Sequence, residues 1–348
     1  MTQVQPYLSI IIPYLNRADL FSRPLRTLKP HAGMKTEVIL VDNGSTDRAP
    51  QLAARFAESM TDSEWMDVKL LKCPQRNASA ARNAGLAEAT GLWVYFFDSD
   101  DEFSPEFFPD FFSFSQVHAD DDLIALRTCM LMPDGCMKER ACLYSDSPAD
   151  QILSSQLATQ CMVFKRDFIL RIGGWCEKIS RWVDWELGVR VLLHHPQMHW
   201  MKGRSYHKIY QHPESITGKD EHSAFHRSME AMEEVEELMY RYASSRESCR
   251  TEAQMHKHGA RFSLTTMLQA LAAREAILAG KLHREGAAGM ADEVMKQARE
   301  TLPHHSARTP LIYIRSAVWK LFLRFICRYT AKGGRGAWRL ALAVSTHV

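Results

Sequence analysis

Two carboxylates spaced two residues apart give the sequence its strongest chemical signal. Asp98 and Asp100 stand in the segment Asp98-Ser99-Asp100-Asp101, directly after the apolar run 93–97. If the chain turns after that run, both carboxylates can face one hard dication such as Mg²⁺ or Mn²⁺, which prefers oxygen ligands and takes the rest from water and phosphates. The alternative is an acidic start to the next helix, where negative charge interacts favourably with the helix dipole.

Polar side chains follow two other apolar runs in the same way. Tyr14 and Asn16 come after the run 8–12, and Asp42 follows the run 37–41. Runs that are apolar on both faces predict strands buried between helices, and their alternation with helical segments predicts a parallel sheet with right-handed crossovers. Because ligands bind at the carboxyl ends of such strands, the shared position favours the ligand-binding interpretation of the paired carboxylates.

Each remaining candidate has a structural and a functional interpretation. Asp42 either closes a tight turn or accepts an N–H from a nucleobase. Arg82, in a predicted Ala-rich helix over 78–89, is either a surface arginine or a planar cation facing a diphosphate. Asp184 lies near the start of a predicted helix over 182–194. It is a candidate general base, because a carboxylate can accept a proton from an attacking hydroxyl.

The middle of the chain carries less chemistry. The acidic run Asp120-Asp121-Asp122 precedes a predicted strand over 123–131, and we expect it to be a solvated loop. The turn sequence 132–135 predicts a hairpin to 136–143. Two shorter strands are predicted over 161–165 and 205–211, and the pattern becomes helical after about residue 220.

The composition is that of a globular chain with an uneven charge distribution. The 348 residues are 46% hydrophobic and 24% charged, which is typical of a folded protein and not of a disordered one. The net charge is +2, so we expect no nucleic-acid partner. Residues 311–348 nevertheless carry seven Lys or Arg and no Asp or Glu. Neither a Walker A motif nor a dinucleotide-binding glycine motif occurs.

Five segments together resemble glycosyltransferase family 2. They are 9–16 (SIIIPYLN), 41–47 (VDNGSTD), 80–86 (AARNAGL), 97–101 (FDSDD) and 184–187 (DWEL). The resemblance implies the GT-A fold, an α/β architecture in which helices flank a Rossmann-like, mostly parallel sheet. It implies a catalytic domain over 1–217, followed by a helical C-terminal region over 218–348.

The resemblance also implies an activity. Family members invert the anomeric centre as they move a sugar from a nucleotide-diphospho-sugar, most often a UDP-sugar, usually with Mn²⁺ or Mg²⁺. We expect the acceptor hydroxyl to belong to a glycan or lipid-linked molecule in bacterial surface-polysaccharide assembly. The alternative is a nucleotide-sugar-binding or partner subunit without transferase activity, which the retained acidic residues argue against.

The family pattern implies a role for each matching residue. Asp42 would hold the base and Arg82 would approach the diphosphate. Asp100 would be the main metal ligand, helped by His212 in the late segment 210–217, and Asp184 would be the catalytic base. The full set of implied nucleotide-sugar-binding residues is Pro13, Tyr14, Asn16, Asp42, Arg82, Asp98 and Ser99.

The chain departs from the family pattern at two places. Val183 stands where a Glu usually precedes the catalytic Asp, which changes acceptor contacts but leaves the base in place. Arg76-Asn77 replaces small glycines before the arginine segment, which alters the predicted nucleotide loop.

The basic tail over 311–340 combines apolar residues at helical spacing with Lys, Arg and Trp. Such a helix either lies in the interface of an anionic membrane or packs on the protein body with its basic side in water. The eight scattered cysteines form no C-x-x-C pair, and the first residues lack a basic leader. We therefore expect a cytoplasmic protein, peripheral on the inner face of the cell membrane if the tail binds lipid.

Overall fold

The structure is a computed structural model that describes residues 5–210, 221–248, 263–302 and 310–345. It divides into two compact units. The sheet unit consists of Met1–Cys142, Leu157–Leu187 and Pro196–Pro213. The helical unit consists of Leu143–Gln156, Gly188–His195 and Glu214–Val348. The predicted domain boundary at 217–218 lies outside the described residues, and two segments that precede it group with the C-terminal helices.

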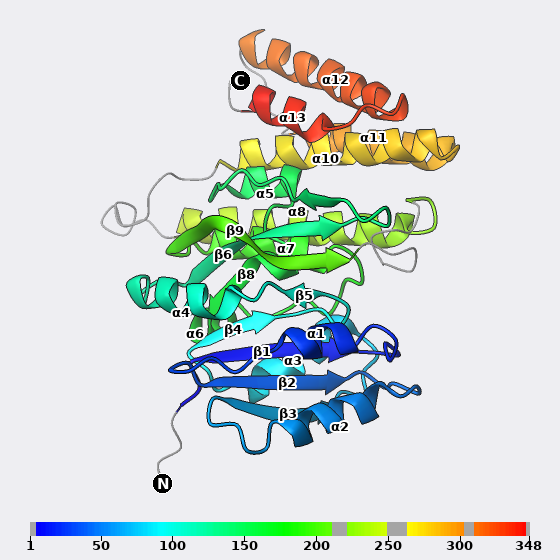
Figure 1. Cartoon of the computed structure of the whole chain (residues 1–348). Coiled ribbons are helices and arrows are strands. Elements are labelled where there is room, and N and C mark those ends of the chain that lie inside the picture. Colours follow the sequence, from blue (N-terminus) through cyan, green and yellow to red (C-terminus); the bar gives the residue numbers. More distant parts are fainter. Residues whose placement is uncertain (1–4, 211–220, 249–262, 303–309, 346–348) are drawn as a thin grey trace. The chain divides into compact units, whose positions relative to one another are not determined.

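The sheet unit is built on one mixed sheet with the strand order β3-β2-β1-β4-β8-β6-β9-β5, with β7 paired to β6 (Figure 1). The strands β1 to β4 run parallel, as predicted. Beyond β4 the sheet becomes mixed, because β8 is antiparallel to both β4 and β6 while β6 and β9 are parallel. The bounds are β1 (Leu8–Tyr14), β2 (Thr36–Asp42), β3 (Met66–Lys72), β4 (Trp93–Phe96), β5 (Glu102–Phe103), β6 (Leu123–Leu131), β7 (Met137–Glu139), β8 (Met162–Lys165) and β9 (Met198–Tyr210).

Helices cover both faces of the inner parallel strands, which explains why β1 and β4 are mostly apolar, whereas the edge strand β3 is partly exposed and carries charged residues. On one face, α3 approaches β1 so closely that a Cβ on Gly85 would lie 2.5 Å from the Ile11 side chain. On the other face, Tyr95 of β4 stacks on Phe107 of α4. The helices of this unit are α1 (Ser22–Thr27), α2 (Ala49–Ser59), α3 (Ala78–Glu88), α4 (Phe107–Val117) and α6 (Arg166–Arg171).

The helical unit is organised around α10. Most residues of α10 between Met267 and Leu282 are buried, because α5, α8, α11, α12 and α13 all pack against this helix. Gly280 permits the closest approach, since a Cβ there would lie 2.6 Å from the Cys327 carbonyl oxygen of α12. The helices are α5 (Pro148–Ser154), α8 (Phe225–Ser248), α10 (Leu264–Arg284), α11 (Ala288–Glu300), α12 (Pro310–Ala331) and α13 (Ala337–Ser345), while α7 (Val183–Leu193) begins in the sheet unit and ends in the helical unit.

The predicted elements are largely confirmed. The four parallel strands, the helix over 182–194 and the helical C-terminal region are present. The strand predicted over 205–211 is the end of the longer β9, and the hairpin strand predicted over 136–143 is reduced to β7. The solvated-loop prediction for 120–122 is wrong for Asp121, which is buried with 1% exposure. Across the described part of the chain, none of the helices is long and apolar enough to cross a membrane.

Candidate active site

We call the edge of the sheet at the carboxyl ends of β1, β2 and β4 the rim. The loops that follow β1 and β2 at the rim are joined by hydrogen bonds. Tyr14 and Asp42 are register partners in the parallel ladder. Beyond them, Asn16 Oδ1 accepts a hydrogen bond from the Thr46 backbone N–H at 2.7 Å, and the Asn16 N–H donates to Ser45 Oγ at 3.1 Å. Asn16 has a positive φ of 49°, which Asn tolerates better than most residues. The two predicted nucleotide segments therefore form one edge.

Asp42 closes the tight turn that follows β2, as its structural interpretation predicts. Its Oδ1 accepts the Ser45 N–H at 2.8 Å, and the carboxylate is only 8% exposed. The next residue, Asn43, donates its amide to the carbonyls of Cys73 and Gln75, which fastens this turn to the end of β3. These contacts hold the turn against the end of β3, and the base-binding role of Asp42 stays a prediction.

Tyr14 and Pro13 contribute to this edge mainly through the backbone. The Tyr14 ring is 4% exposed and stacks on Phe21 at 4.6 Å, and burial raises its pKa, with Asp42 adding to the effect. The Tyr14 carbonyl accepts the Asn43 N–H at 2.9 Å. Pro13 lies in β1 and is partly exposed. The ring of Tyr14 therefore belongs to the core.

Arg82 is a buried cation and not a surface arginine. It is 7% exposed, its Nη2 lies 2.8 Å from Asp98 Oδ1, and its guanidinium lies 4.5 Å from the centre of the Trp175 ring. Arg82 Nε is buried and has no hydrogen-bond partner among the described residues. A stacked, carboxylate-paired guanidinium with a spare donor is suited to binding an oxyanion.

Gln160 and the residue before it, Thr159, link the carboxylate of Asp98 to that of Asp184. Gln160 Nε2 donates to Asp98 Oδ2 at 2.6 Å, so both oxygens of Asp98 have partners. The preceding residue, Thr159, lies with its backbone nitrogen 3.4 Å from Asp184 Oδ2. The single dipeptide 159–160 therefore contacts Asp98 with one residue and Asp184 with the other.

The start of α7 orients Asp184. Asp184 Oδ1 accepts the Trp185 N–H at 3.0 Å, and the preceding Trp182 has a positive φ of 55°. The side chain of Trp185, which follows Asp184, is buried. Asp184 is partly exposed, which is what a group that exchanges a proton with an acceptor requires.

Ser99 and Asp100 continue the turn after β4. Ser99 is buried and Asp100 is partly exposed. His212, with the segment 211–217, lies outside the described residues, so its role as a helper of Asp100 stays a prediction.

Behind this turn lies a buried network that the sequence analysis missed. Asp101 Oδ2 lies 2.8 Å from His207 Nε2, and His207 Nδ1 lies 2.8 Å from the Tyr95 hydroxyl. The Tyr95 hydroxyl has one proton, which it donates to the Gln160 carbonyl at 2.9 Å. His207 Nδ1 must then donate to Tyr95, and a neutral His207 leaves Nε2 to accept a proton from Asp101.

The environment of this network agrees with that proton arrangement. Burial lowers the pKa of His207 to about 3 and so keeps the ring neutral. Burial also raises the pKa of Asp101, and repulsion from Asp98 and Asp100 raises it further. Asp101 is therefore a buried group whose protonated form is favoured, while Asp98 and Asp100 are partly exposed. No sequence signal separates His207 from the other fourteen histidines.

A loop from the second half of the sheet unit, residues 174–177, packs against α3. Asn83 Oδ1 accepts the Trp175 N–H at 2.8 Å, and Asn83 Nδ2 lies 2.7 Å from Glu177 Oε1. Gly174 has a φ of 65° and lies so close to Asn83 that a Cβ would be 2.6 Å from Oδ1. This loop holds Trp175 over Arg82, and sequence reasoning did not predict it because the contact spans about ninety residues.

Asn77 has a structural role at the altered nucleotide loop. Its side chain caps α3 by accepting the N–H groups of Ser79 and Ala80 at 2.7 and 3.2 Å. Arg76 is exposed, and its guanidinium lies 3.4 Å from the Gly44 carbonyl. The substitution for glycine therefore adds a cation beside the turn that follows Asp42.

The donor set after β4 fits a hard divalent cation. Asp98 and Asp100 offer only carboxylate oxygens, both residues are partly exposed, and Arg82 offsets part of their charge. A separate cluster with nitrogen donors, His118, Asp121 and His199, also has a composition suited to a metal. That cluster lies at the amino-terminal ends of β6 and β9, away from the rim.

Comparisons with known proteins find similar sequences for part of the chain. The Glycosyl transferase family 2 model matches residues 9–131. The chain is 31% identical over 152 residues to the uncharacterized glycosyltransferase YibD of Escherichia coli, covering 44% of this chain and 41% of YibD. It is 35% identical over 101 residues to the minor teichoic acid biosynthesis protein GgaA of Bacillus subtilis, covering 28% of this chain and 22% of GgaA. The chain thus spans less than half the length of these curated relatives.

Solved structures share the fold across nearly the whole chain. Residues 1–349 of S. aureus TarS, in complex with UDP-GlcNAc, give a TM-score of 0.63 at 14% identity, covering 98% of this chain and 91% of TarS 1–349. The mannosyltransferase PcManGT of Pyrobaculum calidifontis, in complex with GDP-Man and Mn²⁺, gives 0.52 at 15% identity, covering 99% and 88%. The predicted GT-A fold is therefore confirmed. The family model covers residues 9–131, and the relatives that match the chain include named glycosyltransferases, so this part of the chain is similar to glycosyltransferase family 2.

Proposed function

We propose that the chain transfers a sugar from a nucleotide-diphospho-sugar to an acceptor hydroxyl, with inversion, at the rim of the sheet unit. The observation that carries the proposal is the dipeptide 159–160, which contacts both Asp184 and Asp98. A single displacement needs a base on the acceptor side and positive charge on the leaving-group side of one sugar carbon. In this proposal Thr159 and Gln160 hold the base, Asp184, near Asp98, which pairs with the cation Arg82.

The reaction follows from the positions of these groups. Asp184 accepts the proton of the acceptor hydroxyl while its oxygen forms a bond to the anomeric carbon. The bond from that carbon to the diphosphate oxygen breaks, and the electron pair leaves with the nucleoside diphosphate. Arg82 offsets the negative charge that develops on the diphosphate, helped by its low exposure. Its pairing with Asp98 and its stacking on Trp175 hold it in place.

The nucleotide part of the donor would lie along the edge formed by β1 and β2. In this proposal Asp42 binds the base, Pro13, Tyr14 and Asn16 shape the pocket, and Ser99 lies near the ribose with Asp98. Asp98 and Asp100 would hold Mn²⁺ or Mg²⁺, with His212 as a further candidate ligand. The bound dication supplies charge neutralisation for the diphosphate.

We propose a UDP-sugar as the donor and a glycan or lipid-linked molecule as the acceptor, in surface-polysaccharide assembly. TarS, which shares the fold, was crystallised with UDP-GlcNAc, and GgaA is named for teichoic acid biosynthesis. PcManGT, which was crystallised with GDP-Man and Mn²⁺, makes a GDP-sugar the principal competing donor.

The exposed side of α12 supports a peripheral membrane location on the cytoplasmic face. Trp319 and Leu323 are buried, so one side of the helix packs within the helical unit, as one of the two interpretations predicts. The other side exposes an apolar strip flanked by basic residues, as the membrane interpretation predicts. The exposed apolar residues are Val318, Leu321 and Phe325, and the exposed basic ones are Lys320, Arg324 and Arg328.

A donor panel tests the function directly. The full chain is mixed with UDP-, GDP- and dTDP-sugars, with and without Mn²⁺, and followed by thermal shift and by slow hydrolysis of the donor. We expect a metal-dependent thermal shift and release of UDP from one UDP-sugar. Tight donor binding without release of nucleotide, in the presence of candidate acceptors, would favour the binding-subunit alternative. No shift with any donor would contradict the proposal.

A further inference from the structure

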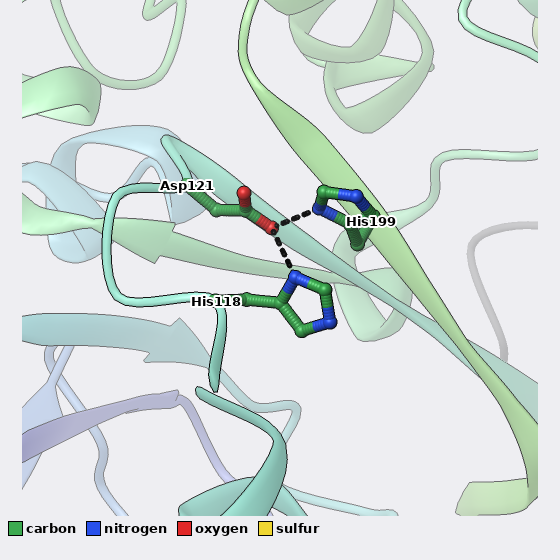
Figure 2. Close-up of side chains that lie close together, drawn as sticks. All are labelled: His118, Asp121 and His199. Carbon is green, nitrogen blue, oxygen red and sulfur yellow. Dashed lines mark hydrogen bonds and ion pairs between the residues drawn. The ribbon is translucent and has the colours of Figure 1, made fainter. Parts of the chain in front are cut away.

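We propose that His118, Asp121 and His199 form a second metal site, which binds a transition-metal dication of the zinc class. His118 follows α4, Asp121 precedes β6, and His199 lies near the start of β9 (Figure 2). One ligand atom from each residue lies within 4.8 Å of the other two. Two imidazoles and a carboxylate are a donor set that favours zinc, cobalt or nickel over magnesium.

Asp121 is the buried centre of the cluster. Its Oδ2 lies 2.7 Å from His199 Nδ1 and 3.8 Å from His118 Nδ1, and its side chain is 1% exposed. Its other oxygen, Oδ1, is buried and has no hydrogen-bond partner among the described residues. Buried carboxylate oxygens are normally satisfied, so the Asp121 carboxylate has acceptor capacity beyond its contacts with the two histidines.

The two imidazoles present the same ring nitrogen to the same carboxylate, as Figure 2 shows. Their ring centroids lie 4.1 Å apart, and the His118 ring also contacts the Phe114 ring at a centroid distance of 4.3 Å. Zinc bonded to nitrogen and oxygen in a tetrahedron places its ligand atoms about 3.3 Å apart. The observed Oδ2–Nδ1 separations of 2.7 and 3.8 Å lie on either side of that value, and all three ligand atoms lie within 4.8 Å of one another.

The backbone holds the three residues in place independently of any ligand. The Asp121 N–H donates to the His118 carbonyl at 3.1 Å, which closes the turn between them. The Asp122 N–H donates to the Gln197 carbonyl at 2.8 Å, and Asp122 Oδ2 accepts the Gln197 N–H at 3.0 Å. These bonds fix the start of β6 against the start of β9, and such preorganisation lowers the cost of assembling a metal site.

The site is separate from the proposed donor site. His199 and His207 pair with Ile124 and Thr128 of β6, which lie four positions apart, or about 13 Å along that strand, because β9 is irregular between the two histidines. His207 contacts Asp101 behind the turn that follows β4, so the two metal-binding regions are separated along β6 and β9. A cation at His199 would join the end of α4 to β6 and β9, and water would complete its coordination. This inference does not depend on the proposed glycosyl transfer.

Cobalt and zinc binding to the metal-free full chain test the proposal. The measurements are visible absorption of Co²⁺ and equilibrium dialysis with Zn²⁺. We compare the wild type with His199→Gln, whose side chain is half exposed and whose substitution should not prevent folding. Asp121→Asn is the second site variant, while Asp100→Asn and the exposed-residue change His226→Gln are controls.

We expect one tight equivalent of metal in the wild type and both controls. Affinity should fall at least about tenfold in His199→Gln and in Asp121→Asn. Zn²⁺ should also raise the melting temperature of the wild type but not that of His199→Gln. The proposal is overturned if the wild type binds no Co²⁺ or Zn²⁺, if His199→Gln binds as tightly as the wild type, or if Asp100→Asn removes the tight equivalent.

Discussion

Asp98 and Asp184 differ in how many of their oxygens are engaged, and this difference separates their proposed roles. Asp98 accepts from Arg82 on one oxygen and from Gln160 on the other, so both of its oxygens are held by neighbouring side chains. Asp184 accepts two backbone N–H groups from nearby residues and remains partly exposed. The first arrangement suits charge organisation, and the second suits transient protonation.

Removal of the proposed base should affect turnover and not donor binding. Asp184→Asn keeps the shape of the side chain but lacks a carboxylate that can take the acceptor proton. We expect kcat to fall by about 10²-fold or more while the dissociation constant for the donor changes little. Asp167→Asn, at a strongly exposed carboxylate, is the control and should keep full activity. Unchanged transfer in Asp184→Asn would remove the residue from this role.

Substitution of Arg82 should show whether shape or charge matters at the diphosphate position. Arg82→Lys keeps the positive charge but loses the planar stack on Trp175 and the geometry of the contact with Asp98. We expect donor affinity to fall about tenfold, because a lysine forms a weaker oriented contact with a phosphate. Isothermal titration with the nucleotide diphosphate measures this change, and equal affinity would show that only charge is needed.

At the scale of elements, the approach of α3 to β1 depends on the absence of a side chain at Gly85. A Cβ there would lie 2.5 Å from the Ile11 side chain and 3.2 Å from the Val41 side chain. Gly85→Ala should therefore lower stability by about 1–3 kcal/mol through overpacking, despite the better helix propensity of alanine. Gly289→Ala in α11 is the matched control, because a Cβ there meets open space. It should be neutral or stabilising by up to about 1 kcal/mol in thermal unfolding.

Another element-scale prediction concerns the pH dependence of the helical unit. Glu275 of α10 is fully buried, and burial raises its pKa above the usual range despite a hydrogen bond from Thr301. A raised pKa in the folded state means that the folded protein binds more protons, so the contribution to stability is lost as pH rises through that pKa.

Glu275→Gln should therefore remove this loss. We expect the wild type to become less stable between pH 5 and 9, while the variant changes less over the same range. Melting temperature against pH, followed in both proteins, gives the comparison. Parallel curves would show that Glu275 does not titrate in this way.

At the scale of the whole molecule, the exposed strip on α12 predicts membrane binding. Leu321 and Phe325 are 63% and 52% exposed, beside the basic residues of the same helix. Leu321→Ser with Phe325→Ser should weaken co-sedimentation with anionic liposomes severalfold, and higher salt should weaken it further. Val117→Ser, at an apolar residue of the sheet unit that is 80% exposed, is the control. Equal sedimentation of all three proteins would contradict the membrane role.

Local features of the sequence were enough to predict the parallel strands, the helix that presents Asp184 and the set of rim residues. The apolar runs, the turn residues after them and the family segments are all short-range signals, and a parallel sheet brings the ends of its strands to one edge. The partners of those residues were not predictable in this way. Gln160, Trp175 and His207 contact the rim across long stretches of chain and carry no motif of their own.

Tertiary structure also decided the state of each polar group. Asp121 and Arg82 look like surface residues in the sequence, yet both are buried, and Asp101 is held beside a neutral histidine. Sequence determined which chemical groups this protein has and, through periodicity, which elements carry them. Burial and pairing depend on distant segments that pack together, so only the folded chain determined which carboxylates are charged, which are satisfied and which face a ligand.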